Sequence, residues 1–213
     1  MRRNPGFDGE LHNTYGGNPS IEDGIVTDIR FCIDQVSDIS PLRALRGLRA
    51  VWLQGSTSDS GKLSDLSPLK GMELTSVSVG NTSLTDLSPL AGMPITLLGV
   101  ENTNVESIVV VKEMPITALW IMNTQVADLS PLADKSLNVL RCTNSKVKTL
   151  QGLPAAQVQQ LLCTPEQLPD KAELARLGVT HINGQPVAEF LKEGGVIEPQ
   201  ATEAPPPAES VPP

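Results

Sequence analysis

A tripeptide that recurs at a fixed spacing is the feature of this sequence that most constrains its fold. Ser-Pro-Leu begins at Ser40, Ser67, Ser88 and Ser130. The step from Ser67 to Ser88 is 21 residues, and the step from Ser88 to Ser130 is 42 residues. A degenerate copy that begins at Val109 fills the intermediate position. Self-similarity at such a period indicates a solenoid of stacked units, because each unit is too small to bury its apolar face alone.

The period divides the chain into seven units that share one apolar pattern. They begin at Val26, Leu48, Leu74, Ile95, Ile116, Leu137 and Val158. Apolar residues recur at positions 1, 4 and 6 of a unit, as in Leu74, Val77 and Val79. Side chains alternate between the two faces of a strand, so this spacing predicts a short strand at positions 3 to 7. Positions 3, 5 and 7 would then face away from the core.

Polar residues mark two further places in each unit. Position 9 is Thr82, Thr103, Thr124 or Ser145 in four of the units. We expect these hydroxyls to form a structural ladder that bonds main-chain groups of the neighbouring turn. The motif Asp-Leu-Ser-Pro-Leu predicts a short helical or 3-10 turn, with Ser as its N-cap and Pro at its first position. Its Asp can accept main-chain hydrogen bonds in a tight bend.

These patterns predict an α/β fold, a right-handed solenoid with a parallel concave sheet and short turns on the convex side. We expect an N-terminal cap at 1–25, the repeat array at 26–168, a C-terminal cap with two short helices at 169–194, and a disordered proline-rich tail at 195–213. The polar stretch 55–62 is interpreted as a loop that bulges from the second unit. Only 3% of the residues are aromatic, which suits thin stacked layers.

Composition argues against several classes of function. The net charge of −8 argues against a nucleic-acid surface, which needs clustered Lys and Arg. No apolar run is long enough for a membrane span, and the N-terminus does not have the pattern of a secretory signal. Three cysteines without framework spacing favour a reducing compartment, so we expect a cytoplasmic location. No nucleophile, base and orienting group can be placed together, so we expect no enzyme activity and no cofactor.

Two possible sites have simpler structural interpretations. Cys142 and Cys163 both occupy position 6 of their units, where a disulfide or a metal pair is conceivable. Buried free thiols in adjacent core strands are the favoured interpretation. The repeated Asp at position 13 could suggest a row of calcium sites, but a local role in the turn is favoured. His12 and His181 lie in opposite end regions, so we expect no metal site.

The repeats resemble the leucine-rich-repeat family, in the short form found in internalins. Segments such as 4–9, 36–45, 86–94 and 182–190 are similar to leucine-rich-repeat regions of planctomycete proteins. Those regions often form the C-terminal part of larger proteins, commonly behind a serine/threonine protein kinase domain. The resemblance therefore implies that this chain could be the regulatory or sensory tail of such a kinase. No phosphate loop, His-Arg-Asp or Asp-Phe-Gly motif is present here.

The candidate binding site lies on the concave face. Both tryptophans fall at position 5, on the face expected to be exposed. Trp and Arg are over-represented at binding hot spots. The predicted partner-binding residues are Trp52, Glu101, Trp120, Met122 and Arg141.

The alternative for this cluster is that these are ordinary surface residues, with Trp120 stacked on its strand neighbours. The function predicted from the sequence is a monomeric, non-catalytic scaffold that binds a protein or peptide partner. The kinase-tail function is the second hypothesis.

Overall fold

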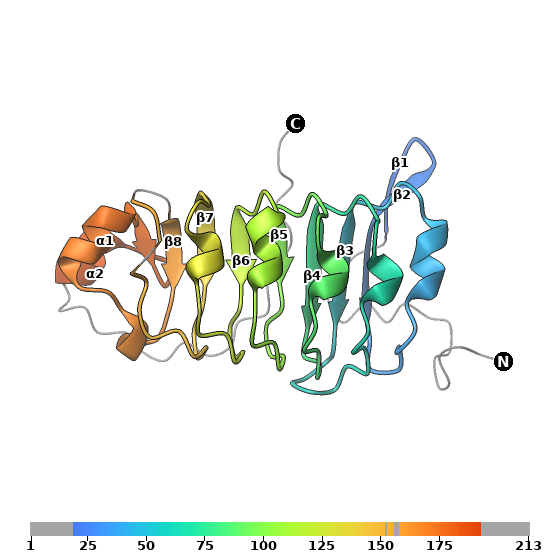
Figure 1. Cartoon of the computed structure of the whole chain (residues 1–213), viewed down its shortest axis with the longest axis horizontal. Helices are drawn as coiled ribbons and strands as arrows, with labels where there is room; N and C mark the ends of the chain where they lie inside the picture. Colours follow the sequence, from blue (N-terminus) through green and yellow to red (C-terminus); the bar gives the residue numbers. More distant parts are fainter. Residues whose placement is uncertain (1–18, 152, 156–157, 193–213) are drawn as a thin grey trace.

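The computed structural model describes residues 19–151, 153–155 and 158–192, and they form one sheet of ten strands in sequence order (Figure 1). The strands are β1 Ser20–Glu22, β2 Ile25–Cys32, β3 Ala50–Gln54, β4 Ser76–Gly80, β5 Leu97–Gly99, β6 Ala118–Trp120, β7 Leu137–Arg141, β8 Val158–Leu162, β9 His181–Ile182 and β10 Gln185–Pro186. Neighbouring strands from β2 to β9 pair in parallel. β1 and β10 add antiparallel edges at the two ends.

The strand register agrees with the predicted units. In-register partners run through Asp28, Ala50, Ser76, Leu97, Ala118, Val139 and Gln160. Each of these residues is position 3 of its unit, so the starts of all seven units are confirmed. Position 4 is fully enclosed from β3 to β8, as at Val51, Leu98 and Leu161. The core is therefore a stack of thin aliphatic layers, in which each layer buries its apolar surface against the next.

The convex side carries short 3-10 turns, as predicted (Figure 1). They are η1 Ser40–Ala44, η2 Ser67–Leu69, η3 Ser88–Leu90, η4 Val109–Glu113, η5 Ser130–Leu132 and η6 Pro165–Gln167. The predicted N-cap role of serine was wrong, because Leu87 is the N-cap of η3 and Ser88 is its first residue. The carboxylate of Asp86 instead accepts hydrogen bonds from the main-chain N–H and the hydroxyl of Ser88, at 2.8 and 2.9 Å. These bonds lower the pKa of Asp86.

The predicted threonine ladder differs from the hydrogen bonds that the structure shows. Thr103 and Thr124 are buried, but their hydroxyls donate to carbonyls three residues earlier in the same unit, at 2.6 and 2.7 Å. The Thr82 hydroxyl accepts from the N–H of Leu84, also in its own unit. Of these four hydroxyl groups, only that of Ser145 accepts a hydrogen bond from the next unit among the described residues, from the Gln167 amide at 3.1 Å. The position-9 residues therefore mainly stabilise their own turns.

Asparagine side chains at position 8 link the units instead. Asn102 donates to the side-chain oxygen of Asn81 at 2.8 Å, and Asn123 donates to that of Asn102 at 2.7 Å. Asn81 donates in turn to the carbonyl of Gly55. All three asparagines have a positive φ of 53–57°, a conformation that asparagine tolerates better than other side chains. We call Asn81, Asn102 and Asn123 the asparagine ladder.

Different devices occupy the two ends of the array. At the N-terminal end, β1 and β2 form a hairpin through Asp23 and Gly24, both with positive φ. At the C-terminal end, helix α1 Lys171–Leu177 is capped by Asp170 and stops at Gly178, and helix α2 Val187–Lys192 follows β10. Residues 1–18 of the predicted N-terminal cap and the predicted tail 195–213 lie outside the described residues.

The inserted stretch in the second unit is held by one carboxylate. Asp34 accepts hydrogen bonds from the main chain and hydroxyl of Ser56 and from the hydroxyl of Ser60. Gly61 then pairs with Thr82, which returns the chain to the next unit. The regular pattern of the repeat therefore resumes from Gly61 onward.

Candidate functional site

Position 5 of the strands forms a row that crosses the concave face from β2 to β7. In register, its members are Arg30, Trp52, Ser78, Gly99, Trp120 and Arg141. The row is symmetric in residue type, with arginines outside, tryptophans next and small residues at the centre. Because each unit contributes one residue, the row appears in the sequence only when the units are aligned with one another.

The two tryptophans meet over the small residues at the centre. Three strand steps separate β3 from β6, which corresponds to about 14 Å. The ring centroids of Trp52 and Trp120 are nevertheless only 5.7 Å apart, with the planes inclined by 47°. Both side chains must therefore lie along the sheet toward each other, above Ser78 and Gly99. A larger residue at either central position would block that approach.

An arginine packs on each tryptophan. The guanidinium carbon of Arg30 lies 5.0 Å from the ring centroid of Trp52, and that of Arg141 lies 4.8 Å from the ring centroid of Trp120. Both distances are within the range of a cation–π interaction. Arg30 is also oriented by Asp28, whose carboxylate accepts from Nε at 3.2 Å and from Nη2 at 3.3 Å.

Position 7 adds a second layer of contacts beside this row. The Gln54 amide donates to the Ser78 hydroxyl at 2.6 Å and to Oε1 of Glu101 at 2.9 Å. It reaches Glu101 across β4, where Gly80 leaves the space open. A Cβ atom at Gly80 would lie 2.3 Å from the Gln54 Oε1, and one at Gly99 would lie 2.9 Å from the Glu101 Oε2. Glycine at both positions is thus a packing requirement of the site.

Glu101 is a carboxylate in an enclosed environment. Only 5% of the residue is exposed, and this burial raises the pKa of its carboxyl group. The Gln54 hydrogen bond and the positive charge of Arg141 oppose the increase. Its second oxygen, Oε2, has no hydrogen-bond partner among the described residues, and the same holds for the indole N–H groups of Trp52 and Trp120. We call Trp52, Gln54, Ser78, Glu101 and Trp120 the concave cluster.

The sequence places both tryptophans at position 5, as the register shows, but the exposure predicted for them was wrong. Trp52 and Trp120 were expected to be exposed, yet only 8% and 6% of each residue is accessible. The reason is that the rings cover each other and are flanked by arginines. Met122 and Arg141 are half-buried, as are Leu97, Ala118 and Val139 at position 3. We call Leu97, Ala118, Met122 and Val139, which are half-buried apolar residues of the concave face, the apolar strip.

Sequence reasoning missed the polar and small members of the site. Gln54 and Ser78 were assigned to the concave face but not to a cluster, and Arg30 was not selected. The usable signal was the row itself, because tryptophans three units apart flank a serine and a glycine. Cys142 and Cys163 are buried free thiols, and burial raises the pKa of Cys163 to about 12.

Comparison with known proteins identifies the fold. No protein-family model matches the sequence, and no curated protein matches it either. Among solved structures, internalin C2 from Listeria monocytogenes strain 4b F2365 matches with a TM-score of 0.58 at 20% sequence identity. The match covers 65% of this chain and 62% of the internalin chain, so it spans less than two thirds of that protein. This chain has the fold of a leucine-rich-repeat solenoid.

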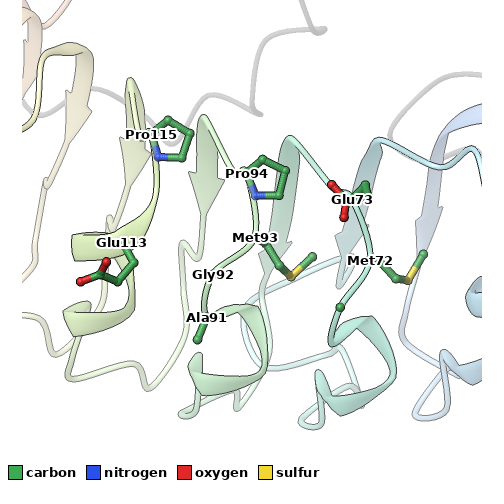
Figure 2. A pocket seen from close by; sticks show the side chains of 9 residues that line it. Met72, Glu73, Ala91, Gly92, Met93, Pro94, Glu113 and Pro115 are labelled. Carbon is green, nitrogen blue, oxygen red and sulfur yellow. The ribbon is translucent and has the colours of Figure 1, made fainter.

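A hollow in the described part of the solenoid lies away from the concave face (Figure 2). It has a volume of about 310 Å³ and is lined by residues such as Met72, Met93, Pro94 and Pro115. Figure 2 shows that these residues come from successive units, where the chain passes from the convex turns toward the next strands. No buried polar atom that lacks a partner in the described part of the chain belongs to its lining. The concave cluster is therefore the stronger candidate.

Residues 19–151, 153–155 and 158–192 contain no group of three or more His, Cys, Asp or Glu side chains arranged to hold a metal ion. Over the same ranges, no helix has the length and apolar character needed to cross a membrane.

Proposed function

We propose that this solenoid is a non-catalytic scaffold that binds a protein or peptide partner on its concave face. The observation that carries the proposal is the position-5 row with its two arginines and two tryptophans, to which six units contribute one residue each and which the repeat pattern does not require. Core positions are explained by packing, whereas Trp52 and Trp120 lie on the outward face of the sheet. Trp and Arg are enriched among residues that dominate binding energy.

The accessible contact surface would be the apolar strip, with the concave cluster beneath and beside it. Leu97, Ala118 and Val139 are in-register neighbours on β5, β6 and β7. Met122 adds a flexible side chain, a type that adapts to different binding partners. Arg141, which is half-buried, would supply a charged contact of the same surface, and Glu101 is buried in the concave cluster.

A charge placed on the apolar strip tests this proposal without disturbing the buried rings. Met122→Lys should reduce capture of a partner at least about tenfold, because an ammonium group would have to be desolvated at the interface. Val109→Lys is the matched control, since Val109 is 65% exposed on the convex side. Circular dichroism of both variants checks that the fold is intact. Equal partner recovery by wild type and both variants would contradict a concave binding face.

The kinase-tail function stays a separate proposal that rests on the sequence resemblance. It predicts a serine/threonine kinase domain encoded in the same reading frame upstream of Met1, which genome sequence can check. The cytoplasmic location and the monomeric state are predictions of the scaffold proposal. Cell fractionation and sedimentation of the full chain would test them.

A further inference from the structure

The concave cluster contains both hydrogen-bond donors and a hydrogen-bond acceptor that are buried and unpaired within the described part of the chain. The indole N–H groups of Trp52 and Trp120 are donors, and Oε2 of Glu101 is an acceptor. None of the three has a partner among the residues that the structure describes. A buried donor or acceptor that stays unpaired has lost its hydrogen bonds to water without replacement, which costs free energy. A ligand that paired them would recover that free energy.

The surrounding charges favour a neutral ligand. Arg30 is paired with Asp28 at 3.2 Å. The charge of Arg141 acts on Glu101 and lowers its pKa against the effect of burial. The two arginines and two carboxylates of this face therefore balance, so neither a cation nor an anion would find an uncompensated charge.

We infer that the concave cluster is a subsite for an amide group of the partner. A carbonyl oxygen has two lone pairs and can accept from two N–H groups, while the amide N–H can donate to a carboxylate oxygen. One amide thus offers what both indoles and Oε2 of Glu101 lack. A cation would satisfy only the carboxylate, and an anion only the indoles. This inference rests on the proposed concave binding function and specifies the chemistry of the ligand.

Access to the subsite requires a small movement. The cluster stands on the outward face of the sheet, and 5% of Glu101 is exposed. Met122 is half-buried at the equivalent position of the next unit. Its thioether chain is flexible and can move aside. Trp120 lies in the adjacent row, at position 5.

Titration of the ¹⁵N-labelled full chain with small amides tests the subsite. The chain has two tryptophans, so its indole N–H signals in a two-dimensional NMR spectrum are assigned with Trp52→Phe and Trp120→Phe. The probes are N-methylacetamide, which mimics a main-chain amide, and acetamide, which mimics Asn and Gln side chains. N,N-dimethylacetamide is the matched control, because it accepts hydrogen bonds but cannot donate one.

Saturable shifts of both indole signals are expected with N-methylacetamide or acetamide. Loss of the donor in N,N-dimethylacetamide should weaken binding about tenfold, the value for one hydrogen bond to a charged group. Glu101→Met should remove this preference, because all probes then lack the carboxylate partner. The tighter of the two donor probes identifies a main-chain or a side-chain amide as the source.

Linear shifts that are equal for all three probes would overturn the subsite, as would tighter binding of methylammonium or acetate at the same signals. Such a result is distinguishable from failure of the scaffold proposal. The titration needs no partner, whereas Met122→Lys tests partner capture. Loss of capture in that variant together with linear shifts would keep the binding face and reject the amide subsite.

Discussion

The asparagine ladder and the concave cluster are two polar systems at adjacent positions of the same units. Asn102 belongs to the ladder, and the residue before it, Glu101, belongs to the cluster. In the ladder, the same residue recurs and each side chain bonds to the next one. In the cluster, each unit contributes a different residue, and three buried polar atoms lack partners in the described part of the chain. A polar side chain that recurs in successive units and has its hydrogen-bond partners therefore holds the solenoid together. A buried polar side chain that does not recur, and that has an atom without a partner, is a candidate for binding.

The largest expected effect is on the ladder. Asn102→Ala should lower the free energy of unfolding by about 3 kcal/mol, because it removes two hydrogen bonds and because alanine tolerates a φ of 53° less well than asparagine does. Asn102→Gly should cost about 1 kcal/mol less, since glycine accepts this backbone conformation. Urea unfolding followed by tryptophan fluorescence measures both. Equal losses for Ala and Gly would show that backbone strain has no part in the effect.

A change at the neighbouring Glu101 should act in the opposite direction. Burial raises the pKa of Glu101, so the folded state binds its proton more tightly than the unfolded state. Its contribution to stability is then present below the ordinary glutamate pKa and is lost as the pH rises through the raised value. Glu101→Gln removes the buried charge and should stabilise the protein by about 1 kcal/mol at pH 7. The difference should shrink as the pH is lowered toward the ordinary glutamate pKa.

Unfolding curves at several pH values test this prediction. Glu106→Gln is the matched control, because Glu106 is an exposed glutamate of the same unit and should change stability little. A Glu101→Gln variant that is less stable than wild type at pH 7 would contradict the description of Glu101 as a costly buried charge.

A smaller effect is expected between the two tryptophans. Trp52→Leu and Trp120→Leu should each destabilise, but the double variant should lose about 1 kcal/mol less than their sum, because the ring contact at 5.7 Å is lost only once. Denaturant unfolding of the four proteins gives the coupling energy. The control cycle combines Trp120→Leu with Val109→Ala on the convex side, where losses should add. Strict additivity in the tryptophan cycle would mean that the rings do not stabilise each other.

The sequence was sufficient to predict the fold, because strand register, unit starts and convex turns follow from apolar spacing and Ser-Pro-Leu. Prediction from the sequence was wrong where two residue types recur together with the same period. The pairs Asn81-Thr82 and Asn102-Thr103 recur together, and the ladder was assigned to the threonine although the asparagine makes the inter-unit bonds. The predicted exposure of Trp52 was wrong for another reason. The ring of Trp52 is covered by Trp120, which lies 68 residues later in the sequence. Periodicity assigns a side chain to a face but does not predict what lies across it.

The smallest effect is expected at Asn144, which tests whether position 8 or its hydrogen bonds make the ladder. Asn144 occupies the same position as Asn102 and has a similar φ of 57°, but it is exposed and makes no side-chain hydrogen bond within the described ranges. Asn144→Gly keeps the backbone conformation and should therefore change the free energy of unfolding by less than about 0.5 kcal/mol. Asn102→Gly should cost several times more in the same urea assay, since it breaks two bonds between units. Similar losses at both sites would show that the asparagine stabilises its own turn, and the distinction between a linked ladder and the unsatisfied concave cluster would then fail.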